Sequence, residues 1–512
     1  MRYFSIVLTL FFLLTLSSSL YAETVESLEK KLMGLQEEYQ KKFDELKQQI
    51  DELKKNADEQ RALYQNQVEE IKKATKEKEE TNKKELEIMQ VKIEEQKKLS
   101  LQSGYDNGFY IKSADDQFMM KIGGYLQTDM RFFESGEDSS NSNTFDIRRA
   151  RIGVSGYLFK HFEYKLQTEL DTADNNLTDA FININYTPLI QLQFGQFKKP
   201  TGYENPISSN YTDFVERALV SDNIAANSRI SGDSRDIGVM LHGKLFEKRL
   251  AYYLGLLNGN GPNTTNDSDN MTFAGRIVAS PFVKTDNSYL KELSFGGSLL
   301  TGDRQAHSSS DFVLAGRNKA LNSLTVDGNR LLAGPELVWY IGPFGLKSEY
   351  YFQREERNKI VAKDTDGVVV FQGNMKDLIT QGYYISAMYM LTGEERGDIV
   401  IPRKNFSLKD GGPGAWEVLA RYEYIDRDKD NGSDPLEDFY RDPLAKDIMG
   451  NPINVAANTI QAITLGLNWY LNKNVRLKLN YVYYDYDKKN NLKNPDIGDS
   501  SSQFLTRFQV VF

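Results

Sequence analysis

The chain contains no cysteine and only three histidines in 512 residues. Without cysteine there are no disulfides and no thiolate metal sites, so strand pairing and packing alone must hold the fold. None of His161, His242 and His307 lies beside an identifiable serine nucleophile, which argues against a barrel enzyme such as a lipase. The net charge of −9 argues against nucleic-acid binding, since such proteins usually carry a basic stripe. The sequence therefore predicts no enzyme, no cofactor and no nucleic-acid partner.

Long hydrophobic runs are also scarce. The longest apolar run extends from Ile6 to Leu16, follows Arg2, and is followed by small residues and a cleavage site after Ala22. It is well short of the roughly 20 residues that a membrane-spanning helix needs. The pattern predicts a secretory signal peptide over residues 1–22 and a mature chain that has no transmembrane helix.

Residues 23–103 contain no proline, are rich in charge, and repeat apolar residues at steps of three and four. This pattern predicts a helix of about 75 residues, which would reach on the order of 110 Å. The apolar seam comprises Val25, Leu28, Leu32, Leu35, Tyr39, Phe43, Leu46, Ile50, Leu53 and Ala57, then Leu86, Met89 and Ile93. A polar-surfaced helix of this length needs a partner, so we expect a self-associating coiled coil with a stutter near Tyr39, and we favour a trimer. The alternative is a single mobile tether.

From Gly104 to the end the period of the pattern changes to two. Apolar residues such as Leu126 and Phe132 alternate with polar ones such as Gln127 and Arg131, and the charged face carries too many charges for a protein core. The chain also has 29 tyrosines and 28 phenylalanines but a negative mean hydropathy. A wall with lipid outside and water inside has these properties, so residues 104–512 are predicted to form an all-β transmembrane barrel.

About 16 antiparallel strands can be counted, and a further hairpin near residues 360–372 would make 18. Short and long connections alternate along the chain, as do the periplasmic turns and external loops of such barrels. With an even strand number, both ends of the barrel segment face the periplasm, so the predicted coiled coil lies there too. A trimeric autotransporter is disfavoured because one chain here supplies a whole wall.

The barrel segment resembles the phosphate-selective porin O and P family over nearly all of residues 104–512. The motifs that carry the resemblance are Gly123–Asp129, Arg148–Arg151, Gly195–Pro200, Phe214–Arg217, Leu391–Glu394, Gly414–Glu417, Gly466–Tyr470 and Arg507–Gln509. The resemblance implies a homotrimer of 16-stranded barrels, each with a pore narrowed by an infolded loop. Here that loop would be the segment from Lys198 to Arg235. The N-terminal helix is not part of the basic family pattern.

Two sets of residues are candidates for functional roles in a pore, one for lining the channel and one for its constriction. The strand residues expected to line the channel and bind anions are Lys121, Arg131, Arg149, Arg151, Lys165, Arg276 and Arg421. The alternative is that these cations only brace the wall by pairing with carboxylates such as Asp129, Glu169 and Glu423. The residues expected at the constriction are Lys198, Lys199, Glu204, Tyr211, Glu216, Arg217, Arg229 and Arg235. The alternative there is that Lys198, Lys199 and Pro200 simply end a strand.

Together these patterns predict an outer-membrane porin for passive diffusion of small hydrophilic solutes, with a preference for anions such as phosphate. Its partners would be outer-membrane lipid, these solutes and further copies of the chain in a homotrimer. A competing hypothesis is a structural protein that links the membrane to peptidoglycan through the coiled coil. Asp426, Asp428, Asp430 and Glu437 are spaced like a calcium loop, but Asn431 replaces its glycine, so no metal is predicted.

Overall fold

The computed structural model describes most of the chain, and it divides into two units, residues 1–96 and 97–512. The described residues are 25–134, 142–170, 177–225, 234–266, 269–308, 312–317, 319–321, 325–363, 369–427, 459–487 and 500–512. The predicted signal peptide, residues 1–22, lies outside them.

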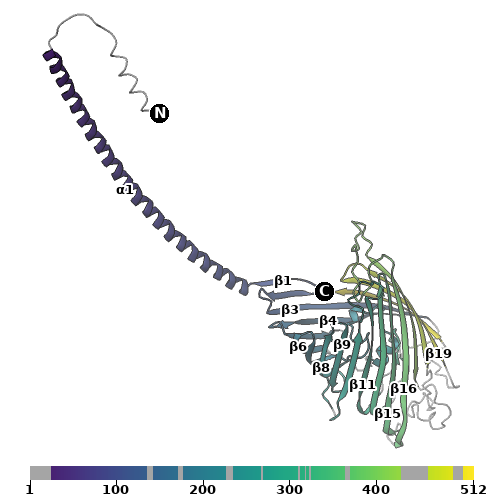
Figure 1. The fold of residues 1–512 in the computed structure, drawn as a ribbon. Helices are drawn as coiled ribbons and strands as arrows, with labels where there is room; N and C mark the ends of the chain where they lie inside the picture. Colours follow the sequence, from purple (N-terminus) through teal and green to yellow (C-terminus); the bar gives the residue numbers. More distant parts are fainter. Residues whose placement is uncertain are drawn as a thin grey trace. The chain divides into compact units, whose positions relative to one another are not determined.

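The first unit is one continuous helix, α1, from Val25 to Leu99 (Figure 1). The helix predicted over residues 23–103 is therefore present, but it ends earlier, because β1 begins at Leu101. Seam residues Leu86, Met89 and Ile93 are exposed in the single chain. The coiled coil remains a prediction, and this exposure is what association would remove. Among the described residues, no helix is long and apolar enough to cross a membrane.

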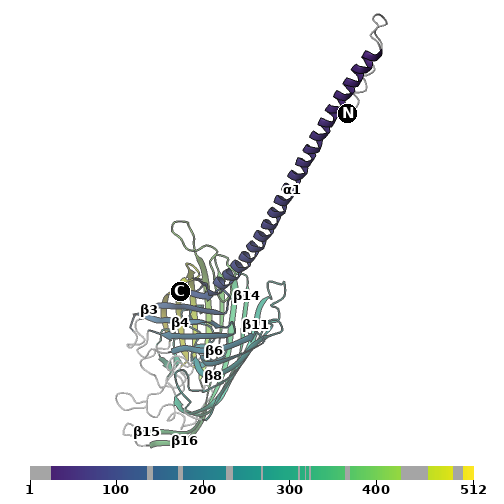
Figure 2. The same ribbon diagram turned by 90° about the vertical axis from the view of Figure 1, so that its left-hand side faces the viewer.

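The second unit is a closed antiparallel β-barrel (Figures 1 and 2). Two of the 18 strands in its sheet, β1 and β2, form a hairpin beside the barrel, and the other 16 make the wall. The first half of the sheet comprises β1 (Leu101–Tyr105), β2 (Phe109–Ser113), β3 (Phe118–Phe133), β4 (Thr144–Leu158), β5 (Phe162–Glu169), β6 (Leu177–Thr187), β7 (Ile190–Lys198), β8 (Arg235–Leu245) and β9 (Leu250–Leu257). The second half comprises β10 (Thr272–Ala279), β11 (Glu292–Ser308), β14 (Thr325–Ile341), β15 (Phe344–Lys363), β16 (Val369–Met390), β17 (Ala415–Arg427), β18 (Thr459–Tyr470), β19 (Val475–Asp487) and β20 (Ser500–Val511).

The prediction of 16 wall strands is confirmed. The region near residues 360–372 adds no further hairpin to the wall, because it prolongs β15 and β16, which stay paired there.

The barrel closes where the last strand meets the first. Strand β20 pairs with β3 up to Val511 opposite Tyr125. The terminal Phe512 then exchanges backbone hydrogen bonds with Gly124, at 2.6 and 2.9 Å. Beyond this point β2 continues the same edge, with Phe109 opposite Ile122. No open edge is left along β3, which satisfies the backbone groups as a membrane requires.

The two faces of the wall differ as the alternation predicts. Outward residues such as Leu465 and Phe508 are exposed, whereas the neighbouring inward residues Arg421 and Arg507 are buried within the barrel. Stacked aromatic pairs stand outward at two levels of the wall, Trp416 with Trp469 and Tyr383 with Tyr424. An apolar band between aromatic girdles is the pattern of an outer-membrane barrel.

Two connections depart from the simple pattern of tight turns at one end and long loops at the other. The connection between β16 and β17, residues 391–414, is long, yet it lies at the tight-turn end, because the amide of Arg396 bonds to the carbonyl of Gly342 and that of Phe406 to Leu471. The connection between β11 and β14 carries a small hairpin, β12 (Phe312–Val313) and β13 (Lys319–Leu321). Neither feature was predicted from the sequence.

Candidate functional site

The loop between β7 and β8 folds into the barrel, as the family resemblance implies. Its described part, residues 199–225, includes a 3₁₀ turn at Ser209–Tyr211 and a π-helical turn at Ser221–Ala225. Apolar loop residues such as Ala218 and Val220 are fully buried. They belong to one cluster with inward residues of the opposite wall, among them Tyr384 and Tyr484. The loop is thus packed against the lumen side of the wall.

A buried carboxylate fixes the beginning of this loop to the wall. Glu349 of β15 accepts hydrogen bonds from the amides of Tyr203 and Glu204, at 2.6 and 3.3 Å, and from three hydroxyls, those of Tyr351 at 2.6 Å, Tyr384 at 2.9 Å and Ser221 at 3.2 Å. Gly202 permits this close approach for two reasons. Its φ is +65°, which glycine adopts without strain, and a Cβ at this position would lie 1.5 Å from the Tyr351 hydroxyl oxygen.

A second segment enters the lumen between β11 and β14. The backbone of Val313 exchanges hydrogen bonds with the Asn223 side chain, at 2.9 and 3.2 Å, and the amide of Ala315 donates to the Tyr484 hydroxyl at 3.0 Å. The apolar run from Phe312 to Ala315 in a polar loop is the sequence signal that could have revealed this segment.

Five arginines gather around three carboxylates on the wall made by β20, β3 and β4. Arg507 forms a two-pronged contact with Asp129, at 2.7 and 2.8 Å, and also reaches Glu216 of the loop at 2.8 Å. Arg148 contacts the same Glu216 at 2.7 Å. We call the set the arginine cluster; its members are Arg131, Arg148, Arg149, Arg317 and Arg507, with Asp129, Asp146 and Glu216. Among the described residues, five cations and three carboxylates make up the cluster, an excess of two positive charges.

Arg148 belongs to this cluster because of a β-bulge. The register between β3 and β4 pairs Gln127 with Arg149 but Thr128 with Ile147, so Arg148 is an extra residue on β4. A bulge turns two successive side chains toward one face. Strict alternation would have placed Arg148 on the lipid side, which is why it was missing from the predicted lining.

A second buried network joins the loop to the tight-turn end of the barrel. Asp213 of the loop pairs with Lys347 of β15 at 2.7 Å and with Arg396 of the 391–414 connection. Arg396 also pairs with Glu417 of β17 at 2.5 Å. Burial alone would raise the pKa of Asp213, but Lys347 and Arg396 outweigh this and hold it below its usual range.

Comparison with known proteins follows from this architecture. The family model "Phosphate-selective porin O and P" matches residues 120–512. The chain belongs to this family.

Porin O of Pseudomonas aeruginosa is 26% identical over 438 residues, covering 79% of this chain and 91% of the relative. An uncharacterized protein of Caulobacter vibrioides is 22% identical over 360 residues, covering 69% of this chain and 65% of the relative. Among solved structures, OmpT of Vibrio cholerae matches 80% of this chain and 99% of its own, with 12% identity and a TM-score of 0.47. Membership of the porin family makes the protein an outer-membrane channel.

Every predicted lining cation that the structure describes has a partner in this porin. Arg131 and Arg149 lie in the arginine cluster, whereas Arg151 pairs with Glu169 and donates to the Tyr125 hydroxyl at 2.7 Å. The remaining pairs are Lys121 with Asp106, Lys165 with Asp179, Arg276 with Glu336, and Arg421 with Glu423. Lys121 and Arg151 therefore pair with other carboxylates than Arg131 and Arg149 do. The role of these residues in permeation remains a prediction.

The predicted constriction residues fall into two groups. Those that hold the loop's own shape are Lys198, which donates to the carbonyls of Asn205 and Ile207, and Arg217, which donates to the carbonyls of Glu204 and Ile207. Arg235 instead pairs with Asp179 on β6 at 2.6 Å.

The other members of the set are placed as follows. Lys199 is buried at the start of the loop, Tyr211 is half-buried with its ring 6.0 Å from the Arg476 guanidinium, and Arg229 lies outside the described residues.

Glu204 is a loop residue whose carboxyl group has a raised pKa. Its carboxylate accepts a hydrogen bond from the amide of Ala218 at 2.9 Å, and it is buried beside Glu349. Burial, helped by Glu349 and opposed by Arg421, raises the pKa of Glu204 to about 7.

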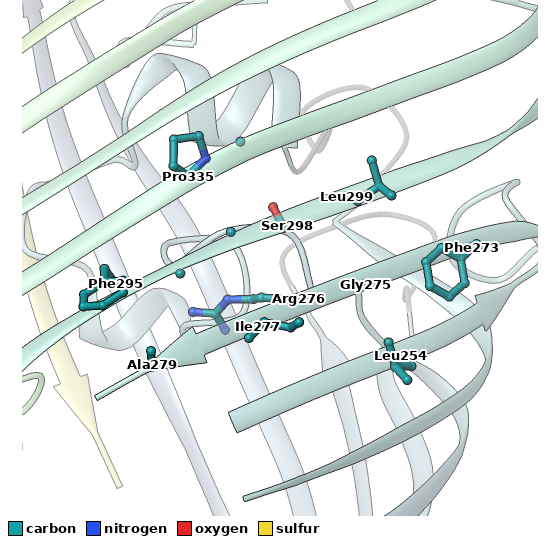
Figure 3. A pocket seen from close by; sticks show the side chains of 13 residues that line it. Leu254, Phe273, Gly275, Arg276, Ile277, Ala279, Phe295, Ser298, Leu299 and Pro335 are labelled. Atoms are coloured by element: carbon teal, nitrogen blue, oxygen red, sulfur yellow. The ribbon is translucent and has the colours of Figure 1, made fainter. Parts of the chain in front are cut away.

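A groove of about 660 Å³ between β10, β11 and β14 lies on the other face of the wall (Figure 3). Outward residues Phe273, Phe295 and Leu299 border it, whereas the guanidinium of Arg276 points inward to Glu336, at 2.6 and 2.9 Å. The groove faces lipid and is not part of the channel.

The acidic run that resembled a calcium loop is described only at Asp426, which accepts a hydrogen bond from Thr459 at 3.1 Å. Asp428, Asp430 and Glu437 lie outside the described residues.

Proposed function

We propose that this porin passes small inorganic and organic anions in preference to cations. The observation that carries the proposal is the arginine cluster, in which five arginines share three carboxylates among the described residues, an excess of two positive charges. Arg317 is half-exposed and Arg148 is partly exposed, so part of the excess charge is accessible to solvent. Guanidinium groups suit phosphate and carboxylate oxygens because they donate two parallel hydrogen bonds.

The channel acts by passive diffusion and no reaction is assigned to it. The lining cations Lys121, Arg131, Arg149, Arg151, Lys165, Arg276 and Arg421 are proposed to set the field along the lumen, even though each is paired. The loop residues Lys198, Lys199, Glu204, Arg217, Arg229 and Arg235 are proposed to set its width.

Single-channel recording in planar bilayers tests the proposal. Under a potassium chloride gradient we expect a reversal potential of the sign that anion permeation gives. Added phosphate should lower the chloride current if phosphate enters the cluster. A reversal potential of the opposite sign would refute anion preference, and absence of a phosphate effect would leave a general porin.

We further propose that the porin works as a homotrimer and that α1 lies in the periplasm. Support comes from the described seam residues of α1, Leu86, Met89 and Ile93, which are exposed in the single chain, and from the even number of wall strands, which brings both ends of the barrel to the tight-turn side. Chemical cross-linking of whole cells should give a trimer, and protease added to intact cells should leave α1 uncut.

The competing function, an anchor between the membrane and peptidoglycan, is supported by the length of α1, 75 residues with a polar surface. Deletion of residues 25–99 separates the two. Unchanged conductance with a detached envelope would favour the anchor, and an intact envelope would exclude it.

A further inference from the structure

The connection between β16 and β17 has an inner and an outer half, divided by the rim of the barrel. The inner half enters the mouth: Arg396 reaches Asp213 and Glu417, and Val400 is buried in a small cluster with the inward residues Met390 and Tyr470. This half is part of the pore architecture already described.

The outer half lies on the lipid side of the rim. The ring of Phe406 packs edge-on against Trp469, with 4.7 Å between ring centroids, and Trp469 stacks on Trp416 at 5.0 Å. Both tryptophans stand on the outward face of the wall, in the girdle at the tight-turn end. Because Phe406 touches this girdle from outside, the segment that follows it also starts outside the barrel.

That segment is a tight hairpin whose tip is apolar. Backbone hydrogen bonds of 3.0 and 3.1 Å join Ser407 and Gly412 in both directions. Leu408, at the tip, is 91% exposed, and Ile401, which precedes the hairpin, is 62% exposed. An ordered turn that presents a leucine so fully to water would gain free energy by transferring it to an apolar phase.

Basic side chains surround this tip. Arg403, Lys404 and Lys409 are all exposed, and among the residues that the structure describes none of their side chains forms an ion pair; the backbone amide of Arg403 donates a hydrogen bond to Glu394 at 3.2 Å. The carboxylate within the hairpin, Asp410, instead accepts a hydrogen bond from the Ser407 hydroxyl at 2.9 Å. The outer half therefore combines an exposed leucine in its turn, an aromatic girdle contact and three exposed basic side chains.

We propose that this hairpin, residues 403–412, binds anionic phospholipid headgroups in the inner leaflet of the outer membrane, with Leu408 at the boundary of the acyl chains. The tight-turn end of such a barrel faces the periplasm, so the leaflet next to the hairpin is the inner one. Exposed apolar residues between lysine and arginine side chains are the usual composition of a segment that lies in a membrane interface. Each lysine or arginine close to an anionic surface adds to the electrostatic attraction.

The inference does not depend on anion preference, because the hairpin is outside the lumen. The inner half of the same connection holds the infolded loop, because Arg396 pairs with Asp213. Asp398 in this half accepts hydrogen bonds from the hydroxyl of Tyr340, at 2.6 Å, and from that of Tyr203. Lipid binding at the tip therefore braces an anchor of the infolded loop.

Spin labelling tests the proposal cleanly, because the chain has no native cysteine. The full-length Leu408→Cys porin, carrying a nitroxide, is reconstituted in phosphatidylcholine vesicles with and without phosphatidylglycerol. We expect the nitroxide to be more accessible to oxygen than to a water-soluble nickel chelate, and the ratio to rise when phosphatidylglycerol is present.

The matched controls change the same number of charges at the same end of the barrel. Combining Leu408→Cys with Arg403→Gln, Lys404→Gln and Lys409→Gln should abolish the response to phosphatidylglycerol. Neutralising Lys248, Lys284 and Lys291 instead, in the β8–β9 and β10–β11 connections at the same end of the barrel, should leave it intact. An oxygen-to-nickel ratio that does not respond to phosphatidylglycerol, or a protected label that becomes accessible when trimers are dissociated, would overturn the proposal. Reversal potentials measured on the same variants report anion preference separately.

Discussion

Replacing Glu216 by glutamine tests whether the arginine cluster sets the ion preference of the channel. Glu216 is the loop carboxylate that Arg148 and Arg507 contact at 2.7 and 2.8 Å, with Arg149 at 3.5 Å. Glutamine keeps the size and the acceptor oxygen but removes one negative charge. The excess of the cluster then rises from two positive charges to three.

The magnitude follows from Coulomb's law. For an ion about 8 Å from the removed charge, the energy changes by about 0.5 kcal/mol at the dielectric constant of water and by about 2 kcal/mol at an effective value of 20. Each 1.4 kcal/mol is a factor of ten, so anion occupancy near the cluster should rise about 2- to 30-fold. Cation occupancy should fall by a similar factor. Loss of a charged partner at a buried site also costs about 1.5–3 kcal/mol of folding stability, which a 16-stranded barrel can tolerate.

The assay is the reversal potential of single channels under a potassium chloride gradient. Glu216→Gln should shift it further in the anion direction, and Arg148→Gln, which lowers the excess to one charge, should shift it back. Glu247→Gln changes the net charge equally at an exposed turn and should leave it unchanged. A shift of equal size in Glu247→Gln, or no shift in Glu216→Gln in a channel of normal thermal stability, would refute the reasoning.

Three further predictions concern the loop and the helix. The pKa of Glu204 is about 7 in the folded state and 4.5 ordinarily, so the folded state binds an extra proton between these pH values, and stability should fall as pH rises from 4.5 to 7. In Glu204→Gln, the melting temperature measured against pH should not fall in this range. If it falls as in the unchanged protein, another group is responsible. Gly202→Ala places a Cβ against the Tyr351 hydroxyl at a positive φ, so it should lower the free energy of unfolding by about 1–3 kcal/mol and increase open-channel noise. Gly397→Ala, with open space around it, should do neither. Equal unfolding of the two variants in urea would contradict this account. Residues 25–99 expressed as an isolated segment should sediment as a helical oligomer, and a monomer at all concentrations would favour the single tether.

The sequence alone was sufficient for the wall of the barrel. Lipid on one side and water on the other force alternate residues such as Phe508 and Arg507 to be apolar and polar, so the period of two is visible along the strands except at bulges. All backbone groups must pair within a membrane, which makes a closed barrel predictable. The long helix could equally be predicted from the sequence, because its apolar residues repeat at steps of three and four.

The candidate site could be predicted only as a list of cations. Their charge and inward direction followed from alternation, but alternation fails at a bulge, and Arg148 was missed for that reason. The apolar segment from Phe312 to Ala315 was missed because a loop that folds inward has no periodic signal.

What the tertiary structure decided is which charges meet. Arg507 pairs with Asp129, 378 residues away, and with Glu216 from a loop that reaches both only by folding into the lumen. Such pairings depend on the register of sixteen strands and on the path of two loops, and a local pattern contains neither. The sequence by itself therefore determined that a charged lumen lies inside an apolar wall, whereas only the folded barrel determined that five described arginines share three carboxylates there, because electrostatic balance is a property of distances in space.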